Sequence, residues 1–190
     1  MHSPFVFDFI LRVLNNKENY RPPSQIESLR RELSGDKKVL SIEDLGAGSR
    51  TNALKERSMK HLATTAVKPK KYGHLLYRLI KHYQPKQIIE LGTSLGITTA
   101  YIAAANQTAQ VFTIEGSKEI FEVAQNNFKR LGLTNIHPLN GNFDDLLPPI
   151  LHPMPSIDLA YIDGNHRYAP TLNYFHQLIQ KAHNDTILVF

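Results

Sequence analysis

Two glycine-containing stretches combine an acidic residue with a turn that could bind a nucleotide-like cofactor. The first is IEDLGAGSRTN (42–52), and the second is IIELGTSLGITTAYIA (88–103). A cofactor loop of this kind needs a buried strand before it and a helix N-terminus after it, because glycines let backbone amides approach the ligand and the helix end carries partial positive charge. An acidic residue at the end of the next strand, about 20 positions later, can then bind ribose hydroxyls.

The second stretch meets all of these requirements. It follows the apolar run QIIEL and leads into a helical pattern that starts near Ile97. Glu115 ends the next strand-like run, 23 positions after Gly92. The first stretch follows a run with two lysines and precedes a basic segment, and no strand with a terminal carboxylate follows at the right distance. We therefore assign the cofactor to residues 90–96 and interpret DLGAGSR (44–50) as a turn in an N-terminal extension, which could still fold over the site as a lid.

Short β-like runs alternate with helical patterns from about residue 70 onward. Apolar residues recur at helical spacing over 72–83, and the later runs are rich in β-branched residues. This alternation predicts an α/β fold, a doubly wound Rossmann-like sheet with helices on both faces. The predicted strands are QIIEL (87–91), QVFTI (110–114), NIHPLNG (135–141), IDLAYI (157–162) and TILVF (186–190). A predicted helix follows each of the first four strands, at 97–107, 117–132, 143–151 and 168–183.

The N-terminal part of the chain predicts a mostly helical extension. Helices are expected at 4–15, 24–33 and 51–62, with a short β-like run at 37–43. We divide the chain into this extension (1–68) and a cofactor-binding domain (69–190). Because the chain stops at Phe190 inside an apolar strand, we expect that further C-terminal strands of the domain are missing.

Composition and charge limit the possible partners. No apolar run of about 18 residues is present, and the N-terminus has no basic start or cleavage site, so neither a membrane span nor a signal peptide is expected. The absence of cysteine excludes disulfides and thiolate chemistry and fits a cytoplasmic protein. Residues 1–85 hold 16 Lys and Arg against 8 Asp and Glu, whereas residues 86–190 hold 6 against 9. The basic half could face nucleic acid or an acidic partner, or it could be a solvated helical surface.

Four stretches in order resemble the small O-methyltransferases of the class I S-adenosylmethionine-dependent family, of the catechol O-methyltransferase type and its relatives with a D-G-x-H motif. They are YGHLLYRLIKHYQPKQIIELGTSLGITTAYIA, VFTIEGSKE, GNFDDLLP and IDLAYIDGNHRY. The resemblance covers about residues 70–190. The glycine loop reads E-L-G-x-x-x-G as in this family, and it lacks the dinucleotide pattern G-x-G-x-x-G.

The resemblance implies S-adenosylmethionine as the cofactor and a set of residues that bind it. A carboxylate suits the two vicinal ribose hydroxyls because its two oxygens can accept both. The residues at the matching positions are Glu90, Gly92, Thr93, Ser94, Gly96 and Thr98 for the methionine part, Glu115 for the ribose, Asn142 and Phe143 for the adenine, and Asp163 beside the methyl group.

The stretch DGNHRY is the best candidate for the chemical step. In the resembled family the acid at the position of Asp163 often ligates a divalent metal, and His166 falls where a general base would lie. An imidazole suits that role because its pKa ordinarily lies near ~6.5. Asn165 is either a second polar ligand or a turn residue. Mg²⁺ needs several oxygen ligands. The resembled family supplies the ligands other than Asp163 just after the fifth strand, where this chain stops, so at most an incomplete metal site at Asp163 is expected.

The sequence therefore favours an enzyme, a methyltransferase that acts on a small hydroxylated molecule. Three alternatives stay open: a nucleic-acid methyltransferase that uses the basic residues 50–81, a nicotinamide-dependent oxidoreductase, and a non-catalytic interaction protein with a vestigial pocket. A homodimer could cover the unpaired edge that an incomplete sheet would leave. The sequence does not identify the methyl acceptor.

Overall fold

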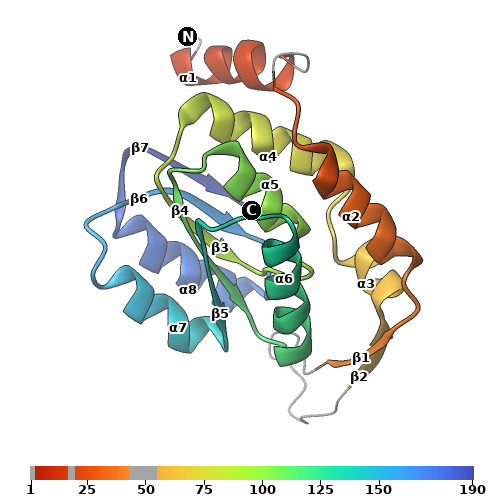
Figure 1. Cartoon of the computed structure of the whole chain (residues 1–190). Coiled ribbons are helices and arrows are strands. Elements are labelled where there is room, and N and C mark those ends of the chain that lie inside the picture. The colour runs from red at the N-terminus through yellow and green to blue at the C-terminus, as the bar shows by residue number, and fades with distance from the viewer. Residues whose placement is uncertain (1–2, 17–19, 43–54) are drawn as a thin grey trace.

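A five-stranded parallel sheet forms the centre of the protein, and helices cover both of its faces (Figure 1). The computed structural model describes residues 3–16, 20–42 and 55–190. The strand order is β5-β4-β3-β6-β7, so the chain winds outward from β3 first on one side and then on the other. The strands are β3 (Gln87–Leu91), β4 (Gln110–Glu115), β5 (Ile136–Asn140), β6 (Ile157–Ile162) and β7 (Ala182–Val189). The predicted doubly wound Rossmann-like sheet is confirmed.

The direction of winding changes between β3 and β6, which are hydrogen-bonded neighbours. In a sheet of this type the crevice at the carboxyl ends of the strands beside such a reversal is where ligands bind. Glu90 in β3 lies opposite Thr113 of β4 and Tyr161 of β6. The loops that follow these three strands therefore meet at one edge of the sheet.

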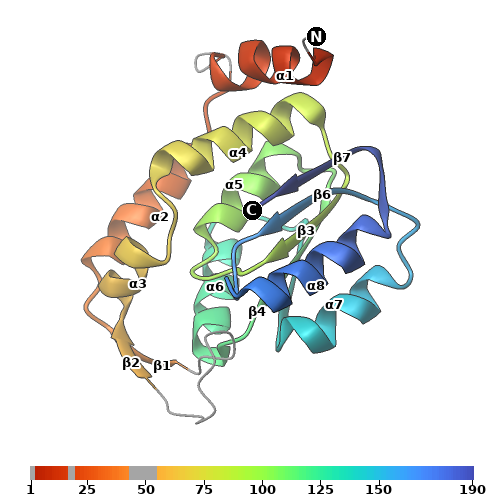
Figure 2. The same cartoon turned by 180° about the vertical axis from the view of Figure 1, so that it is seen from behind.

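Two hydrophobic cores lie on the two faces of the sheet. Successive residues of a strand point to opposite faces, so Ile88 packs into one core and Ile89 into the other. The helices α4, α5 and α6 cover the first face, and α7 and α8 cover the second (Figure 2). Their bounds are α4 (Lys70–Tyr83), α5 (Ile97–Ala105), α6 (Lys118–Arg130), α7 (Phe143–Leu151) and α8 (Tyr168–Ile179).

The N-terminal extension packs outside α4 and α6 (Figure 1). It consists of α1 (Pro4–Asp8), the π-helix η1 (Phe9–Leu14), α2 (Ser24–Gly35), β1 (Val39–Ile42), β2 (Lys55–Ser58) and α3 (Met59–Thr65). Its buried residues, among them Val13, Ile26 and Leu40, belong to the same core as α4 and α5. The extension therefore contributes directly to the core beside the sheet, and the division at residues 68 and 69 stays a prediction.

The predicted helix over residues 51–62 is confirmed for residues 59–62, which begin α3, and is wrong for residues 55–58. Residues 55–58 form β2, which pairs antiparallel with β1 in a separate two-stranded sheet. Helix α3 begins only at Met59, because the Ser58 hydroxyl accepts a hydrogen bond from the backbone N–H of His61 at 3.2 Å and caps the helix. The turn DLGAGSR and the lid assigned to it lie outside the described residues.

The end of the chain also differs from the prediction. Helix α8 ends at Ile179 rather than at residue 183, and β7 begins at Ala182 rather than at residue 186. The earlier start is fixed by pairing with β6, since Ala182 lies opposite Ile157 and the Thr186 hydroxyl donates to the Ile157 carbonyl at 2.7 Å. In the described part of the chain, none of the helices has the length and apolar character needed to cross a membrane.

Candidate active site

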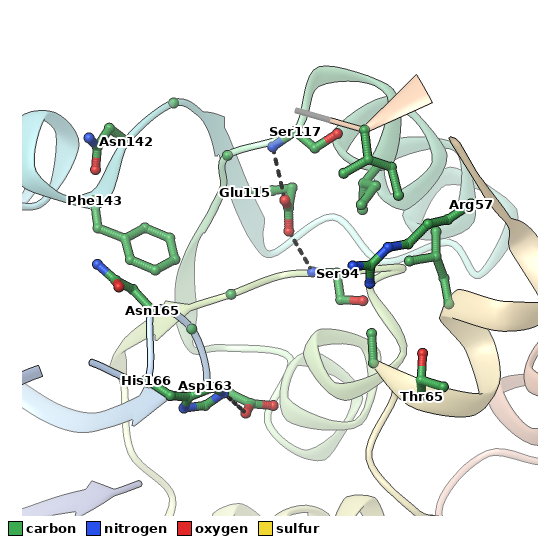
Figure 3. A pocket seen from close by; sticks show the side chains of 18 of the residues that line it. Arg57, Thr65, Ser94, Glu115, Ser117, Asn142, Phe143, Asp163, Asn165 and His166 are labelled. Carbon is green, nitrogen blue, oxygen red and sulfur yellow. Dashed lines mark hydrogen bonds and ion pairs between the residues drawn. The ribbon is translucent and has the colours of Figure 1, made fainter. Parts of the chain in front are cut away.

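A cavity of about 350 Å³ lies at the carboxyl ends of β3, β4 and β6 (Figure 3). The glycine loop after β3, the end of β4, the start of α7 and the loop after β6 form one part of its wall. The N-terminal extension closes another part with Ile42, Arg57, Leu62 and Thr65. Eight of the residues that the sequence singled out line this cavity: Gly92, Ser94, Glu115, Asn142, Phe143, Asp163, Asn165 and His166.

The glycine loop and the loop after β6 touch each other at Gly92. The φ angle of Gly92 is 107°, and a Cβ atom there would lie 2.4 Å from the Asp163 carbonyl oxygen. The Asp163 N–H in turn donates to the Leu91 carbonyl at 2.8 Å. Only glycine fits this crossing without displacing the backbone of Asp163.

Glu115 is held in a fixed orientation at the end of β4. Its Oε2 accepts a hydrogen bond from the Ser94 N–H at 2.9 Å, and its Oε1 accepts one from the Ser117 N–H at 3.0 Å. Burial raises the pKa of this carboxyl, and the backbone N–H groups oppose the shift. Each oxygen keeps a second lone pair, so the carboxylate can accept two further hydroxyls from a ligand in the cavity.

The residues proposed for the adenine lie at the start of α7. Asn142 caps this helix, since its Oδ1 accepts a hydrogen bond from the Asp144 N–H at 3.1 Å. The Phe143 ring packs edge-on against Tyr174 with a centroid distance of 5.7 Å. A Cβ at Gly164 would lie 2.7 Å from this ring. Phe143 thus borders both the cavity and the second core, and Asn142 uses its side chain in part for capping.

Four residues proposed for the methionine part do not line the cavity: Glu90, Thr93, Gly96 and Thr98. They support the loop from behind. The Thr93 hydroxyl lies 2.6 Å from that of Thr113. Gly96 caps α5 with a φ angle of 77°, and a Cβ there would lie 2.5 Å from the Phe128 ring. Thr98 is largely buried on the first turn of α5.

Glu90 is fully buried beneath the glycine loop. Its Oε2 accepts hydrogen bonds from the hydroxyls of Thr99 at 2.5 Å and Thr113 at 2.6 Å. Its Oε1 is buried and has no hydrogen-bond partner among the described residues. Burial raises the pKa of Glu90 to about 8, and the negative charges of Asp163 and Glu115 add to the effect.

Asp163 lies at the end of β6 with both carboxylate oxygens engaged. Oδ2 accepts a hydrogen bond from the Tyr161 hydroxyl at 3.0 Å, and Oδ1 lies 2.8 Å from Nζ of Lys68. The His166 ring is more distant, with Nε2 at 3.7 Å from the same Oδ1, and this side chain is 73% exposed. Asp163 and His166 are thus brought together at one side of the cavity (Figure 3).

The donor set around Asp163 does not fit a divalent cation. A hard cation needs several oxygen ligands at roughly 2.0–2.6 Å. The Lys68 ammonium already occupies the neighbourhood of Oδ1. Within the described ranges, no group of three His, Cys, Asp or Glu side chains is placed to hold a metal ion.

Sequence reasoning missed the residues that the extension brings to the cavity, chiefly Arg57, Thr65 and Lys68. It treated the lysines around position 70 as one basic surface. Pro69 could have distinguished Lys68 from the lysines that follow it. Pro69 caps α4, so Lys68 lies in the segment before the helix rather than on the helix. Ser117, whose N–H orients Glu115, was also missed, although it directly follows the strand that carries the carboxylate.

The reversal at β3, the glycine loop and the carboxylate at the end of β4 together define a Rossmann-like architecture of the methyltransferase type. Residues 89–190 match the family model described as "Methyltransferase domain". The chain belongs to this family, and the resemblance to class I S-adenosylmethionine-dependent O-methyltransferases is confirmed.

Two curated relatives and one solved structure illustrate the similarity. The chain is 30% identical over 154 residues to a catechol O-methyltransferase of Niastella koreensis, covering 80% of this chain and 67% of that protein. It is 35% identical over 84 residues to the O-methyltransferase hkm8 of Aspergillus hancockii, covering 43% of this chain and 32% of that protein. The methyltransferase PaMTH1 of Podospora anserina has the same fold, with a TM-score of 0.66 at 15% identity over 99% of this chain and 71% of that one. The chain is therefore shorter than each of these proteins.

Proposed function

We propose that the protein transfers a methyl group from S-adenosylmethionine to a hydroxyl oxygen of a small acceptor. One observation carries the proposal: the preorganised Glu115 carboxylate shares a cavity with Asp163 and His166. The names of the two curated relatives, both O-methyltransferases, support this reaction. The structure of PaMTH1 was solved with S-adenosylhomocysteine bound, which supports the choice of cofactor.

The residues present fit S-adenosylmethionine. The glycine at position 92 keeps the loop free of a side chain at its crossing with Asp163, and the Glu115 oxygens can accept ribose hydroxyls. The Phe143 ring and Asn142 line the cavity together at the start of α7 (Figure 3) and would border the adenine. Glu90, Thr93, Gly96 and Thr98 would act on the cofactor by shaping the loop and α5 rather than by lining the cavity.

The bound cofactor supplies an electrophilic methyl carbon on a sulfonium, so the protein has to position and deprotonate the acceptor. His166 accepts the acceptor's hydroxyl proton at Nε2, and the oxygen forms a bond to the methyl carbon. The carbon–sulfur bond breaks, and its electron pair stays on sulfur. The proposed reaction has no step through Mg²⁺, because the donor set around Asp163 does not fit that ion.

The remaining expectations about partners are also part of the proposal. The name of the relative from Niastella koreensis, a catechol O-methyltransferase, supports a small acceptor rather than a nucleic-acid strand. The missing G-x-G pattern disfavours a nicotinamide. A homodimer that covers the edge strand β7 stays a prediction for light scattering to test, and the cytoplasmic location stays a prediction too.

The first test is calorimetric titration of the protein with S-adenosylmethionine and, in parallel, with NAD. We expect micromolar binding of the former alone. Mass spectrometry of a panel of catechols, phenols and alcohols incubated with protein and cofactor should then detect a product heavier by one methylene. Binding of NAD alone, or methylation of RNA but of none of the small hydroxyl compounds, would overturn the proposal.

A further inference from the structure

Lys68 places a cation at the transfer site. Its Nζ lies 2.8 Å from Oδ1 of Asp163, and Lys68 lines the cavity. The Asp163 side chain is only 14% exposed, whereas that of Lys68 is 40% exposed. In this ion pair the Asp163 carboxylate is therefore largely shielded from water, whereas the Lys68 side chain is accessible from the cavity. Oδ1 of Asp163 is also the atom that His166 approaches, so the cation and the proposed base flank one oxygen.

The backbone of Lys68 is fixed from both directions. Nη1 of Arg30 on α2 donates a hydrogen bond to the Lys68 carbonyl at 2.7 Å. Pro69 follows and caps α4, and a residue before proline is restricted to extended conformations. Val67 on the other side is buried in the core. This lysine is thus held at the cavity by the fold, unlike a lysine on a freely solvated surface.

A lysine here changes what Asp163 can do. A divalent cation bound to Oδ1 would have to displace the Lys68 ammonium, at a cost in charge repulsion. An ammonium can instead donate up to three hydrogen bonds. One goes to Asp163, and the others are available to an oxygen in the cavity.

We propose that Lys68 binds the ionised oxygen of the methyl acceptor and takes the place of a divalent cation at this site. The inference rests on the proposed function. In the step, the hydroxyl proton passes to His166, the oxyanion is held by the Lys68 ammonium, and the oxygen bonds to the methyl carbon as the carbon–sulfur pair returns to sulfur. Lys68 keeps its protons throughout, and Asp163 orients its side chain. Acceptors with acidic hydroxyls, such as phenols and catechols, gain most from a fixed ammonium because it stabilises an oxyanion more than a neutral hydroxyl.

The test uses the full chain with 4-nitrocatechol, whose absorbance changes when it ionises. Binding of the probe is followed with S-adenosylhomocysteine, and turnover with S-adenosylmethionine, each in EDTA and in Mg²⁺. The variants are Lys68→Met, which removes the ammonium, and Lys68→Arg, which keeps a charge. The control is Lys71→Met, which makes the same change three residues away on the exposed start of α4. Calorimetry with S-adenosylmethionine and thermal unfolding accompany every variant.

We expect turnover in EDTA to stay within about twofold of that in Mg²⁺. Lys68→Met should lower turnover roughly 100-fold, as loss of an oxyanion donor does, and should abolish the absorbance change, with cofactor affinity and folding retained. Lys68→Arg should restore part of both, and Lys71→Met should match the unmodified protein. Loss of turnover in EDTA with recovery in Mg²⁺, or an unchanged absorbance response in Lys68→Met, would overturn the role of Lys68. Failure of the unmodified protein to bind S-adenosylmethionine would instead overturn the proposed function, and the role of Lys68 with it.

Discussion

The backbone N–H of Ser94 donates a hydrogen bond to Oε2 of Glu115 at 2.9 Å and so ties the glycine loop after β3 to the end of β4. The Ser117 N–H holds the other oxygen. The carboxylate therefore has its orientation before any ligand arrives, and a ligand with two vicinal hydroxyls need not pay the entropy of ordering it. This preorganisation makes Glu115 the most direct point at which to test cofactor binding.

Replacing Glu115 by Gln should weaken the binding of S-adenosylmethionine by roughly 30- to 100-fold. Two charge-assisted hydrogen bonds to the ribose become weaker or are lost, which corresponds to ~2–3 kcal/mol. Calorimetry measures the change directly. Glu122→Gln is the matched control, because this glutamate is exposed on α6. The affinity of this variant for S-adenosylmethionine should equal that of the unmodified protein. Equal affinities for the two variants would show that Glu115 does not bind the ribose.

The sequence predicted the sheet well, and it singled out residues of the glycine loop and of the end of β4 that the structure brings to one cavity, because both depend on local patterns. The strands β3, β4 and β6 are short apolar runs, and Gly92 and Glu115 stand at fixed distances along the chain. A pattern of this kind is readable without knowing the tertiary structure.

In the extension the sequence predicted the helices at 4–15 and 24–33 and the strand near 37–43, but it missed β2 and the residues that the extension brings to the cavity, because these depend on distant contacts. The residues of β2 are polar and carry no strand pattern, and they are extended because they pair with β1. Lys68 belongs to the site only because α2 and the start of α4 bring it to Asp163, 95 positions later in the chain. No spacing rule links residues that are so far apart.

Replacing Gly92 by Ala should destabilise the protein and abolish cofactor binding. The added methyl group would meet the Asp163 carbonyl at 2.4 Å, and the φ angle of 107° disfavours any side chain. Gly132→Ala is an informative control, since its φ angle is 66° but nothing lies within 4 Å of the new Cβ. It should cost only ~1 kcal/mol of unfolding free energy, and thermal melts should show a clearly larger drop for Gly92→Ala. Similar drops would mean that the crossing of the two loops relaxes easily.

Replacing His166 by Gln should reduce the rate of methyl transfer by roughly 10²- to 10⁴-fold, the usual contribution of a general base. Affinity for S-adenosylmethionine should not change, because the His166 side chain is 73% exposed and its Nε2 lies as far as 3.7 Å from Oδ1 of Asp163. Single-turnover rates with a catechol separate the chemical step from binding. His152→Gln, an exposed site at the end of α7, should leave the rate intact. A rate that survives in His166→Gln would assign the proton to another acceptor, such as water.

Glu90 should make the stability of the protein fall as the pH rises. Its pKa is raised to about 8 in the folded state against 4.5 for an ordinary glutamate. The folded protein therefore holds a proton that the unfolded chain releases, and the resulting stability is complete below pH 4.5 and is lost as the pH rises through about 8. Thermal melts of the unmodified protein and of Glu90→Gln should be compared between pH 5 and pH 9.

The amide of Glu90→Gln cannot ionise, so the variant should gain stability relative to the unmodified protein as the pH rises. The difference between the two melting temperatures cancels the effect of other titrating groups, and it should correspond to a few kcal/mol across the full range. Thr113→Val is the control, because it removes a hydroxyl that donates to Glu90 but leaves the Glu90 carboxyl able to ionise. A difference that does not vary with pH would mean that Glu90 is ionised throughout.

Arg30 should act on catalysis only through Lys68, because its guanidinium donates to the Lys68 carbonyl at 2.7 Å. Arg30→Met should lower turnover by about tenfold, the effect expected when a hydrogen bond of ~1.4 kcal/mol no longer holds a catalytic group in place. The neighbouring Arg31→Met is the control, since Arg31 is exposed and contacts Ser28 on its own helix. The decisive measurement is the double variant: in the Lys68→Met background, Arg30→Met should have little further effect on turnover. A purely structural role for Arg30 would lower turnover by the same factor in both backgrounds, because the loss of folded protein does not depend on the side chain at position 68.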